Sequence, residues 1–188
     1  MGKRRLNNYA MGKNQVFIAT SLDGCIADKS GSIDWLHSIP NPNNIDMGYG
    51  EFISKIDALV MGRKTFETVC GFDMDWPYQI PVFVLSNTLN EISENFKDKA
   101  QLAKGSLKEI LGKIHGKGCY NLYIDGGATI QGFLKEDLID EMTITIIPTL
   151  LGGGIPLFSE LPNRLNFECV ESKIYLNKVV QNKFIKKH

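Results

Sequence analysis

Up to residue 138 the sequence alternates short apolar runs with stretches whose apolar side chains recur at helical spacing. Apolar runs rich in β-branched residues predict buried strands, and amphipathic stretches predict helices. The predicted strands cover residues 15–20, 57–61, 81–85, 100–104 and 122–124. The predicted helices cover residues 46–56, 62–69, 106–115 and a stretch from the glycines at 126–127 to about residue 134. Strands that alternate with helices predict a parallel sheet with helices on both faces.

After residue 138 the pattern changes to strands alone. Residues 142–147 form an apolar run, and residues 166–175 and 179–186 predict a long hairpin that turns near Asn177, a residue type that tolerates positive φ. No linker or repeat divides the sequence. The prediction is therefore a flexible leader over residues 1–13 and a single α/β domain over residues 14–188.

Composition and charge exclude several classes of protein. Lysine plus arginine and aspartate plus glutamate each number 21 in 188 residues, so no basic surface is expected for nucleic acid or an anionic membrane. The four cysteines and three histidines are scattered, which predicts no metal site. No apolar stretch approaches the roughly 20 residues needed to cross a bilayer. We expect a cytoplasmic protein that acts on a small molecule.

Two glycine-containing motifs join a predicted strand to a predicted helix: VMGRKTF at residues 60–66 and YIDGGAT at residues 123–129. The first turn of a helix has unpaired backbone N–H groups and partial positive charge, which suit an anion. Two helix starts at the C-terminal edge of one sheet suit the two ends of a dinucleotide. The alternative is that the glycines only make tight turns, since neither motif has the Rossmann or P-loop sequence.

These segments together resemble a known family. VMGRKTFE, PVFVLSNT and DGGATIQGFL follow IATSLDG in the order found in the dihydrofolate-reductase fold. More narrowly, with LIDE at residues 138–141 and PTLLGGG at residues 148–154, the chain resembles the RibD C-terminal domain, the reductase domain of bifunctional riboflavin biosynthesis proteins. The resemblance spans about residues 14–186. It implies a dihydrofolate-reductase-like mixed, mainly parallel sheet flanked by helices, with a C-terminal antiparallel hairpin.

The resemblance also implies NADPH as the cofactor. It places Ala19 and Ile26 at the nicotinamide, Gly62, Arg63, Lys64 and Thr65 at the pyrophosphate and 2′-phosphate, Leu85, Ser86 and Asn87 at the adenosine, and Gly126, Gly127, Ala128, Thr129 and Ile130 at the pyrophosphate and nicotinamide ribose. The residues agree with this assignment, because a 2′-phosphate needs a cation and Arg63 is the only arginine between residues 6 and 163.

On the substrate side the resemblance assigns catalytic roles to Asp23 and Asp34, and substrate contacts to Trp35 and Asp46. Asp23 follows the first strand, where riboflavin-type reductases hold an acid, and Asp34 and Trp35 are similar to the mobile loop that closes over nicotinamide. Asp46 replaces the pterin-binding carboxylate only in a shifted alignment. The alternatives are that Asp23 is a turn residue, that Trp35 is a hydrophobic anchor of its loop, and that Asp46 starts a helix.

The implied activity is the NADPH-dependent reduction of a small nitrogenous heterocycle, as in 5-amino-6-(5-phosphoribosylamino)uracil reductase. A dihydrofolate reductase and a protein that binds NADPH without turnover are two alternatives. The sequence has only four arginines, so a clamp for a substrate anion would fall to lysines. Relatives are commonly dimeric, and the long hairpin at a sheet edge predicts a homodimer.

Overall fold

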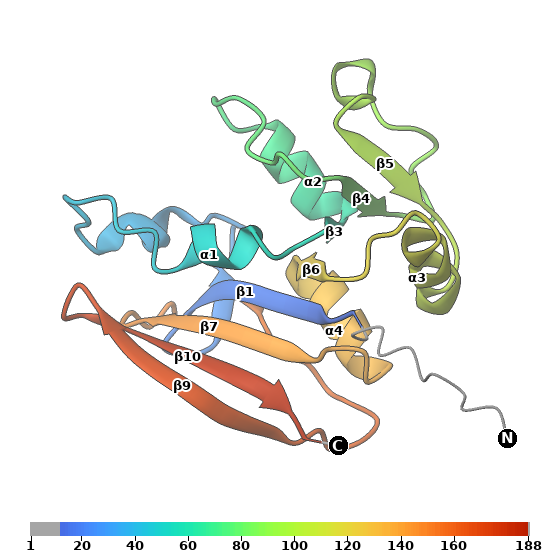
Figure 1. Cartoon of the computed structure of the whole chain (residues 1–188). Coiled ribbons are helices and arrows are strands. Elements are labelled where there is room, and N and C mark those ends of the chain that lie inside the picture. Colours follow the sequence, from blue (N-terminus) through green and yellow to red (C-terminus); the bar gives the residue numbers. More distant parts are fainter. Residues whose placement is uncertain (1–11, 188) are drawn as a thin grey trace, which may run out of the picture.

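The computed structural model describes residues 12–187, in which eight strands form one sheet in the order β5-β4-β3-β6-β1-β7-β10-β9 (Figure 1). The strands of this sheet are β1 (Asn14–Ser21), β3 (Ala58–Gly62), β4 (Val82–Leu85), β5 (Ala100–Ala103), β6 (Leu122–Asp125), β7 (Glu141–Ile147), β9 (Phe167–Tyr175) and β10 (Val179–Lys186). In the sheet, β5, β4, β3, β6, β1 and β7 lie side by side and are parallel. Strand β10 is antiparallel to β7, and β9 is antiparallel to β10. The predicted parallel sheet and C-terminal hairpin are therefore confirmed.

The predicted leader lies outside the described residues except for Gly12 and Lys13. Lys13 forms an ion pair with Glu141, whose carboxylate is buried and also pairs with Lys183 at 2.9 Å. These two lysines lower the pKa of Glu141 against the opposing effect of its burial. The start of the domain is thus joined to β7 and β10.

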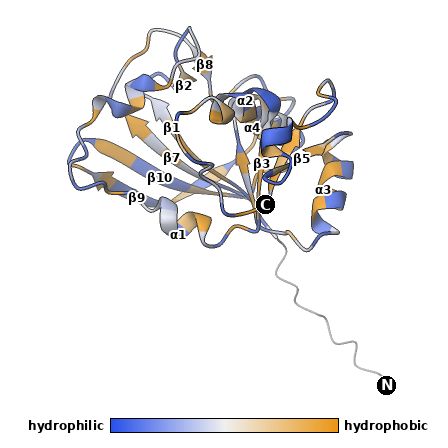
Figure 2. Cartoon of the chain, turned by 90° about the horizontal axis from the view of Figure 1, so that it is seen from above, coloured by the Kyte–Doolittle hydropathy of each residue, from blue (hydrophilic) through white to orange (hydrophobic). Residues whose placement is uncertain are grey.

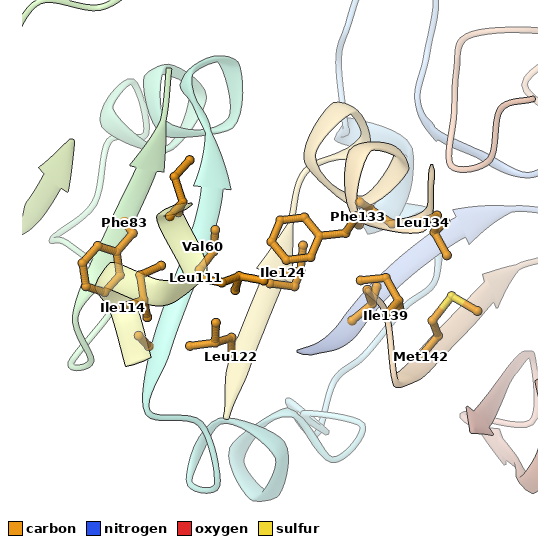
Figure 3. Close-up of a cluster of buried hydrophobic side chains, with 14 of the residues drawn as sticks. Val60, Phe83, Leu111, Ile114, Leu122, Ile124, Phe133, Leu134, Ile139 and Met142 are labelled. Atoms are coloured by element: carbon orange, nitrogen blue, oxygen red, sulfur yellow. The ribbon is translucent and has the colours of Figure 1, made fainter. Parts of the chain in front are cut away.

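Helices cover both faces of the sheet, as predicted. The helices are α1 (Tyr49–Ile53), α2 (Arg63–Cys70), α3 (Leu107–His115) and α4 (Gly127–Lys135), with 3-10 helices η1 (Asp34–Ser38) and η2 (Glu94–Phe96). Alternate residues of β3 enter different cores: Val60 packs with α3 and α4, and Met61 packs with α1 and α2. Figure 3 shows Leu111 of α3 and Phe133 of α4 against the strands of the first core. The central strands are hydrophobic, whereas α1, α3 and the hairpin mix polar and apolar positions (Figure 2).

Helix ends follow local chemistry. Ser106 accepts a hydrogen bond from the Glu109 amide while Glu109 accepts from the Ser106 amide, which is the capping box that starts α3. The predicted helix over residues 46–56 is wrong in length, because α1 spans only Tyr49–Ile53. Met47 adopts a left-handed φ of 53°, which prevents an earlier start. Asp46 accepts hydrogen bonds from the amides of Gly48 and Gly50, both at 2.9 Å, next to the start of α1, and its predicted substrate contact stays a prediction.

The hairpin turns at Leu176 and Asn177, with φ of 54° and 53°. The positive φ of Asn177 was predicted, and that of Leu176 was not. A second sheet was also missed: β2 (Cys25–Ala27) pairs with β8 (Ile155–Pro156). These strands are too short to show a sequence pattern, and they join the segment after β1 to the segment after β7. None of the helices within residues 12–187 is long and apolar enough to cross a membrane.

Candidate functional site

A cleft of about 1060 Å³ opens at the C-terminal ends of β1, β3, β4 and β6. Of the residues predicted to bind NADPH, the cleft is lined by Ala19, Ile26, Gly62, Arg63, Lys64, Thr65, Leu85, Ser86, Gly126, Gly127, Ala128 and Thr129. The structure thus brings together residues from four separate parts of the sequence. Among the predicted set, Asn87 lies beside the cleft, where its side chain accepts a hydrogen bond from the Gly105 amide at 3.3 Å, and Ile130 is fully buried in the core.

Two helices begin side by side at this cleft, and glycines allow their close approach. A Cβ atom on Gly62, before α2, would lie 2.8 Å from the Thr129 hydroxyl oxygen of α4. A Cβ atom on Gly126, before α4, would overlap the Thr65 hydroxyl of α2, and Gly126 has a φ of 87°. Each helix start therefore packs a threonine against the glycine of the other. This contact concentrates the positive ends of two helix dipoles at one place.

Neither of these two helix starts has a side-chain N-cap within the described residues, although the Gly126 amide before α4 donates to the Asp125 carboxyl group. Their N-cap residues are Gly62 and Gly126, which carry no side chain that could accept a hydrogen bond. In contrast, Ser106 caps α3, which does not begin at the same point. A helix start with uncapped amides in an open cleft is suited to bind an anion such as a phosphate.

One end of the cleft presents a positioned cation. The Arg63 guanidinium donates through Nε to Glu67 at 2.6 Å and through Nη1 to the Thr88 hydroxyl at 3.5 Å. The Ser86 hydroxyl accepts hydrogen bonds from the amides of Thr88 at 3.2 Å and Leu89 at 2.9 Å, which orders the loop after β4. Thr88 lines the cleft but was not predicted. Thr88 lies near Arg63 because β3 and β4 are neighbours in the sheet, and the local sequence does not show which strands pair.

The cleft lining also contains a carboxyl group that sequence reasoning missed. Asp125, at the end of β6, accepts a hydrogen bond from the Gly126 amide at 2.8 Å and lines the cleft. Burial raises the pKa of Asp125, and the shift has no contribution from a cation. Asp125 belongs to the DGG motif at residues 125–127, in which the sequence indicated chemistry only for the two glycines.

Tyrosines surround this carboxyl group. Burial raises the pKa values of Tyr49, Tyr78 and Tyr123, and the charge of Asp125 raises them further. The Tyr123 hydroxyl donates to the Phe17 carbonyl at 2.8 Å, and Tyr78 lines the cleft together with Asp125. Asp125 therefore faces an aromatic, partly desolvated region in which a carboxyl group can hold a proton above its usual pH range.

Asp23 lies outside this lining and has a different environment. Its carboxylate accepts hydrogen bonds from the Ser21 hydroxyl at 2.6 Å and from the amides of Leu151 at 3.2 Å and Gly152 at 2.9 Å. These hydrogen bonds, led by that of Ser21, lower its pKa to about 2. Asp23 consequently joins the turn after β1 to the glycine-rich segment after β7. The contacts favour a positioning role, and its predicted catalytic role stays a prediction.

The remaining predicted residues lie on the segment that borders the cleft. Asp34 is exposed at the first turn of η1, whereas its neighbours Ile33 and Leu36 line the cleft. Trp35 is half-buried, and its indole nitrogen has no hydrogen-bond partner within residues 12–187. The described residues contain no group of three or more His, Cys, Asp or Glu side chains that could hold a metal ion.

Comparisons with known proteins agree with this architecture. The family model of the RibD C-terminal domain matches residues 13–181. The uncharacterised protein YwjB of Bacillus subtilis (strain 168) is 36% identical over 174 residues, which cover 86% of this chain and 91% of the relative. A structure from Shewanella sp. PV-4, provisionally assigned to riboflavin biosynthesis, is 55% identical with a TM-score of 0.92, covering 94% of this chain and 99% of the other.

More distant structures share the fold alone. The Thermotoga maritima diaminohydroxyphosphoribosylaminopyrimidine deaminase/5-amino-6-(5-phosphoribosylamino)uracil reductase has a TM-score of 0.74 at 14% identity, and the match covers 94% of this chain and 57% of that longer one. The predicted dihydrofolate-reductase-like fold is confirmed by this likeness. With the match over residues 13–181 and the sheet that carries the cleft, the chain belongs to the RibD C-terminal domain family.

Proposed function

We propose that this protein is an NADPH-dependent reductase of a small nitrogenous heterocycle. The observation that carries the proposal is the pair of uncapped helix starts that meet beside Arg63 in one cleft. Membership of a family that contains reductase domains supports the same activity. NADPH, when bound, supplies a hydride.

The cleft residues fit NADPH in charge and shape. The amides at the starts of α2 and α4 suit a pyrophosphate, and the close Gly126–Thr65 contact brings the two helix starts together. Arg63, beside the hydroxyl groups of Ser86 and Thr88, suits the 2′-phosphate that distinguishes NADPH from NADH. Ala19 and Ile26 then provide an apolar surface for the nicotinamide.

Reduction of a carbonyl or imine carbon requires a proton at the neighbouring heteroatom in addition to the hydride. Asp125 is the best-placed group to provide it, since it lines the cleft and its burial favours the protonated form. Ile33 and Leu36 border the same space and can exclude water from it. Asp23 would act indirectly, by holding the segment that leads into β8.

Cofactor titration tests the proposal. NADPH should bind wild-type protein about 10- to 100-fold more tightly than NADH, because one charge-assisted contact is worth about 1.5–3 kcal/mol. Arg63→Ala should remove that preference, while Arg164→Ala, an exposed arginine outside the cleft, should keep it. Tryptophan fluorescence quenching measures both affinities. Equal affinities of wild-type protein for NADPH and NADH would contradict the proposal.

Turnover is tested separately. Protein loaded with NADPH is mixed with candidate heterocycles, and loss of absorbance at 340 nm follows the oxidation of bound NADPH in a single turnover. Tight NADPH binding without oxidation by any heterocycle would indicate the alternative of a binding protein that lacks turnover.

A further inference from the structure

The charges that line the cleft are distributed unevenly. Within residues 12–187, the cationic side chains that line the cleft are Arg63 and Lys64, both in the first turn of α2. Lys29, on the loop after β2, lies with its side chain against Gly153 and is not part of the lining. All the positive charge of the described lining is therefore at the end that we assign to the phosphates of NADPH.

The rest of the lining is mostly apolar or acidic. It includes Ile18, Ile33 and Leu36, and also the carboxyl group of Asp125 and the phenol of Tyr78. No ion pair links Asp125 to a lysine or arginine in the described part of the chain, and hydrogen bonding with the Gly126 amide and Tyr123 only partly offsets the effect of burial on its pKa. A carboxyl group in this setting accepts hydrogen bonds from N–H donors, and it offers a substrate phosphate no cationic partner.

We propose that the substrate bound next to Asp125 and Tyr78 is a planar nitrogen heterocycle that carries N–H donors and no phosphate group. This inference rests on the proposed function, because the cofactor's pyrophosphate would engage the starts of α2 and α4. A phosphate ester carries a charge of about −1.5 to −2 at pH 7 and is normally bound by arginine, lysine or a helix start. With both helix starts and both lining cations engaged by NADPH, a substrate phosphate would find no further lysine or arginine in the described lining of the cleft.

This substrate class differs from that in the name of the Thermotoga maritima enzyme, which specifies a phosphoribosylamino compound. Because that enzyme shares only 14% of its residues with this chain, its substrate does not transfer. A shared fold can hold a different binding pocket, since specificity depends on the few side chains that contact the substrate.

A matched pair of ligands provides the test. Protein saturated with NADP⁺ is titrated by calorimetry with 5-amino-6-(5-phosphoribosylamino)uracil and with the same compound after removal of its phosphate. We expect the phosphate-free compound to bind at least tenfold more tightly. Equal or tighter binding of the phosphorylated compound would overturn the inference, and so would failure of both compounds to bind. Failure of the protein to bind NADP⁺ would instead count against the proposed function.

Variants of Asp125 and Tyr78 test whether these two residues bind the phosphate-free compound. Asp125→Asn and Tyr78→Phe keep side-chain size and should each weaken binding of the phosphate-free compound by at least tenfold, with NADP⁺ affinity retained. The matched control is Asp98→Asn, an exposed carboxylate in the loop before β5, at the opposite edge of the sheet, which should bind both ligands as wild-type protein does. Unchanged binding by both cleft variants would contradict the assignment to Asp125 and Tyr78.

Adding a cation to the cleft tests whether the lack of a lysine or arginine is what weakens binding of the phosphorylated compound. Ile33→Lys adds a cation to the apolar part of the cleft lining, and Ile33→Gln adds polarity without charge. The lysine variant should bind the phosphorylated compound at least tenfold more tightly than the glutamine variant does. If the two variants bind it equally, the lack of a cation does not determine the preference.

Discussion

At the scale of single residues, the cleft depends on side chains that are absent as much as on those present. Gly62 and Gly126 let two helix starts touch through Thr129 and Thr65. With any larger residue at position 126, the threonine hydroxyl of α2 and the backbone of α4 would compete for the same space. The glycines are thus needed for the geometry of the site, in addition to making a turn between strand and helix.

Gly126→Ala should therefore impair both folding and cofactor binding. Alanine at a φ of 87° is strained, and its Cβ would overlap the Thr65 hydroxyl; strain of this kind costs on the order of 1–3 kcal/mol. Urea denaturation and NADPH titration measure the two effects. The control is Gly112→Ala in α3, where a Cβ meets nothing within 4 Å, and which should stabilise the fold by about 0.5–1 kcal/mol. Wild-type stability of Gly126→Ala would contradict the packing argument.

Asp125 and Asp23 should differ in how pH affects them. The pKa of Asp125 is raised by burial, so a rate that depends on its protonated form should fall as pH rises through that raised pKa. Asp125→Asn should remove this dependence and slow the single-turnover rate by about 10²- to 10⁴-fold. Asp23, with a pKa of about 2, is ionised across the working range, so Asp23→Asn should lower the rate without moving the pH dependence. Rates measured between pH 5 and 9 decide between them.

Stability provides a check on the same variants. A carboxyl group whose pKa is raised in the folded state opposes folding once it ionises, so the protein loses stability as pH rises from the ordinary carboxyl pKa through the raised one. Asp125→Asn should consequently unfold at a higher temperature than wild-type protein at pH 8, with the difference disappearing near pH 4. A less stable variant at pH 8 would show that Asp125 is held by favourable contacts.

The sequence predicted many of the residues that line the cleft, but not the long-range contacts of those residues. Arg63 and Gly126 lie next to strand ends in recognisable local motifs, so their place at the cleft could be inferred from short segments. The contact of Arg63 with Thr88 and the environment of Asp125 depend on which strands are neighbours. Asp23 was assigned chemistry from its position alone, because the amides of Leu151 and Gly152 that hold it come from 128 and 129 residues away.

At the scale of secondary-structure elements, regular segments with a strong pattern were predicted and short, irregular ones were not. The central strands β3, β4 and β6 follow from apolar runs that are buried on both faces, whereas the mostly exposed β9 was predicted as one arm of the hairpin. The β2–β8 pair has strands of only three and two residues, and its pairing brings distant segments together beside the cleft. The late start of α1, at Tyr49 instead of residue 46, was missed for a related reason, because the left-handed conformation of Met47 has no sequence signature.

The capping box of α3 can be separated from the cleft by mutation. Ser106→Ala removes the acceptor for the Glu109 amide, and loss of such a cap costs about 1 kcal/mol of stability. Because α3 packs in the core on the α4 side of the sheet and reaches the cleft only through Leu107 among the lining residues, the variant should melt at a lower temperature while its NADPH affinity stays unchanged. Differential scanning calorimetry and fluorescence titration measure the two quantities. An affinity that falls with the melting temperature would show that α3 positions the cleft.

At the scale of the whole molecule, the cleft and the hairpin lie in different parts of the sheet. The cleft opens at the C-terminal ends of β1, β3, β4 and β6, while β9 and β10 extend the sheet beyond β7 (Figure 1). The two outermost strands also differ: β5 has four residues and β9 has nine. A short edge offers few free backbone groups, whereas a long one offers many, so β9 is the edge that another chain can extend.

The last prediction is that two copies associate through this edge. Val170 and Ile174 of β9 are 50% and 70% exposed, and a two-fold contact would bury both while pairing the free backbone groups of the strand. Ile174→Lys should shift the protein toward a single chain of 21.0 kDa, because a two-fold axis places the new charge on both sides of the contact. Met74→Lys, at a residue that is 63% exposed outside the hairpin, should leave association unchanged. Sedimentation at micromolar concentration measures the mass, and a wild-type protein that sediments as a single chain would rule out this dimer, since the exposed edge would then be stable without a partner.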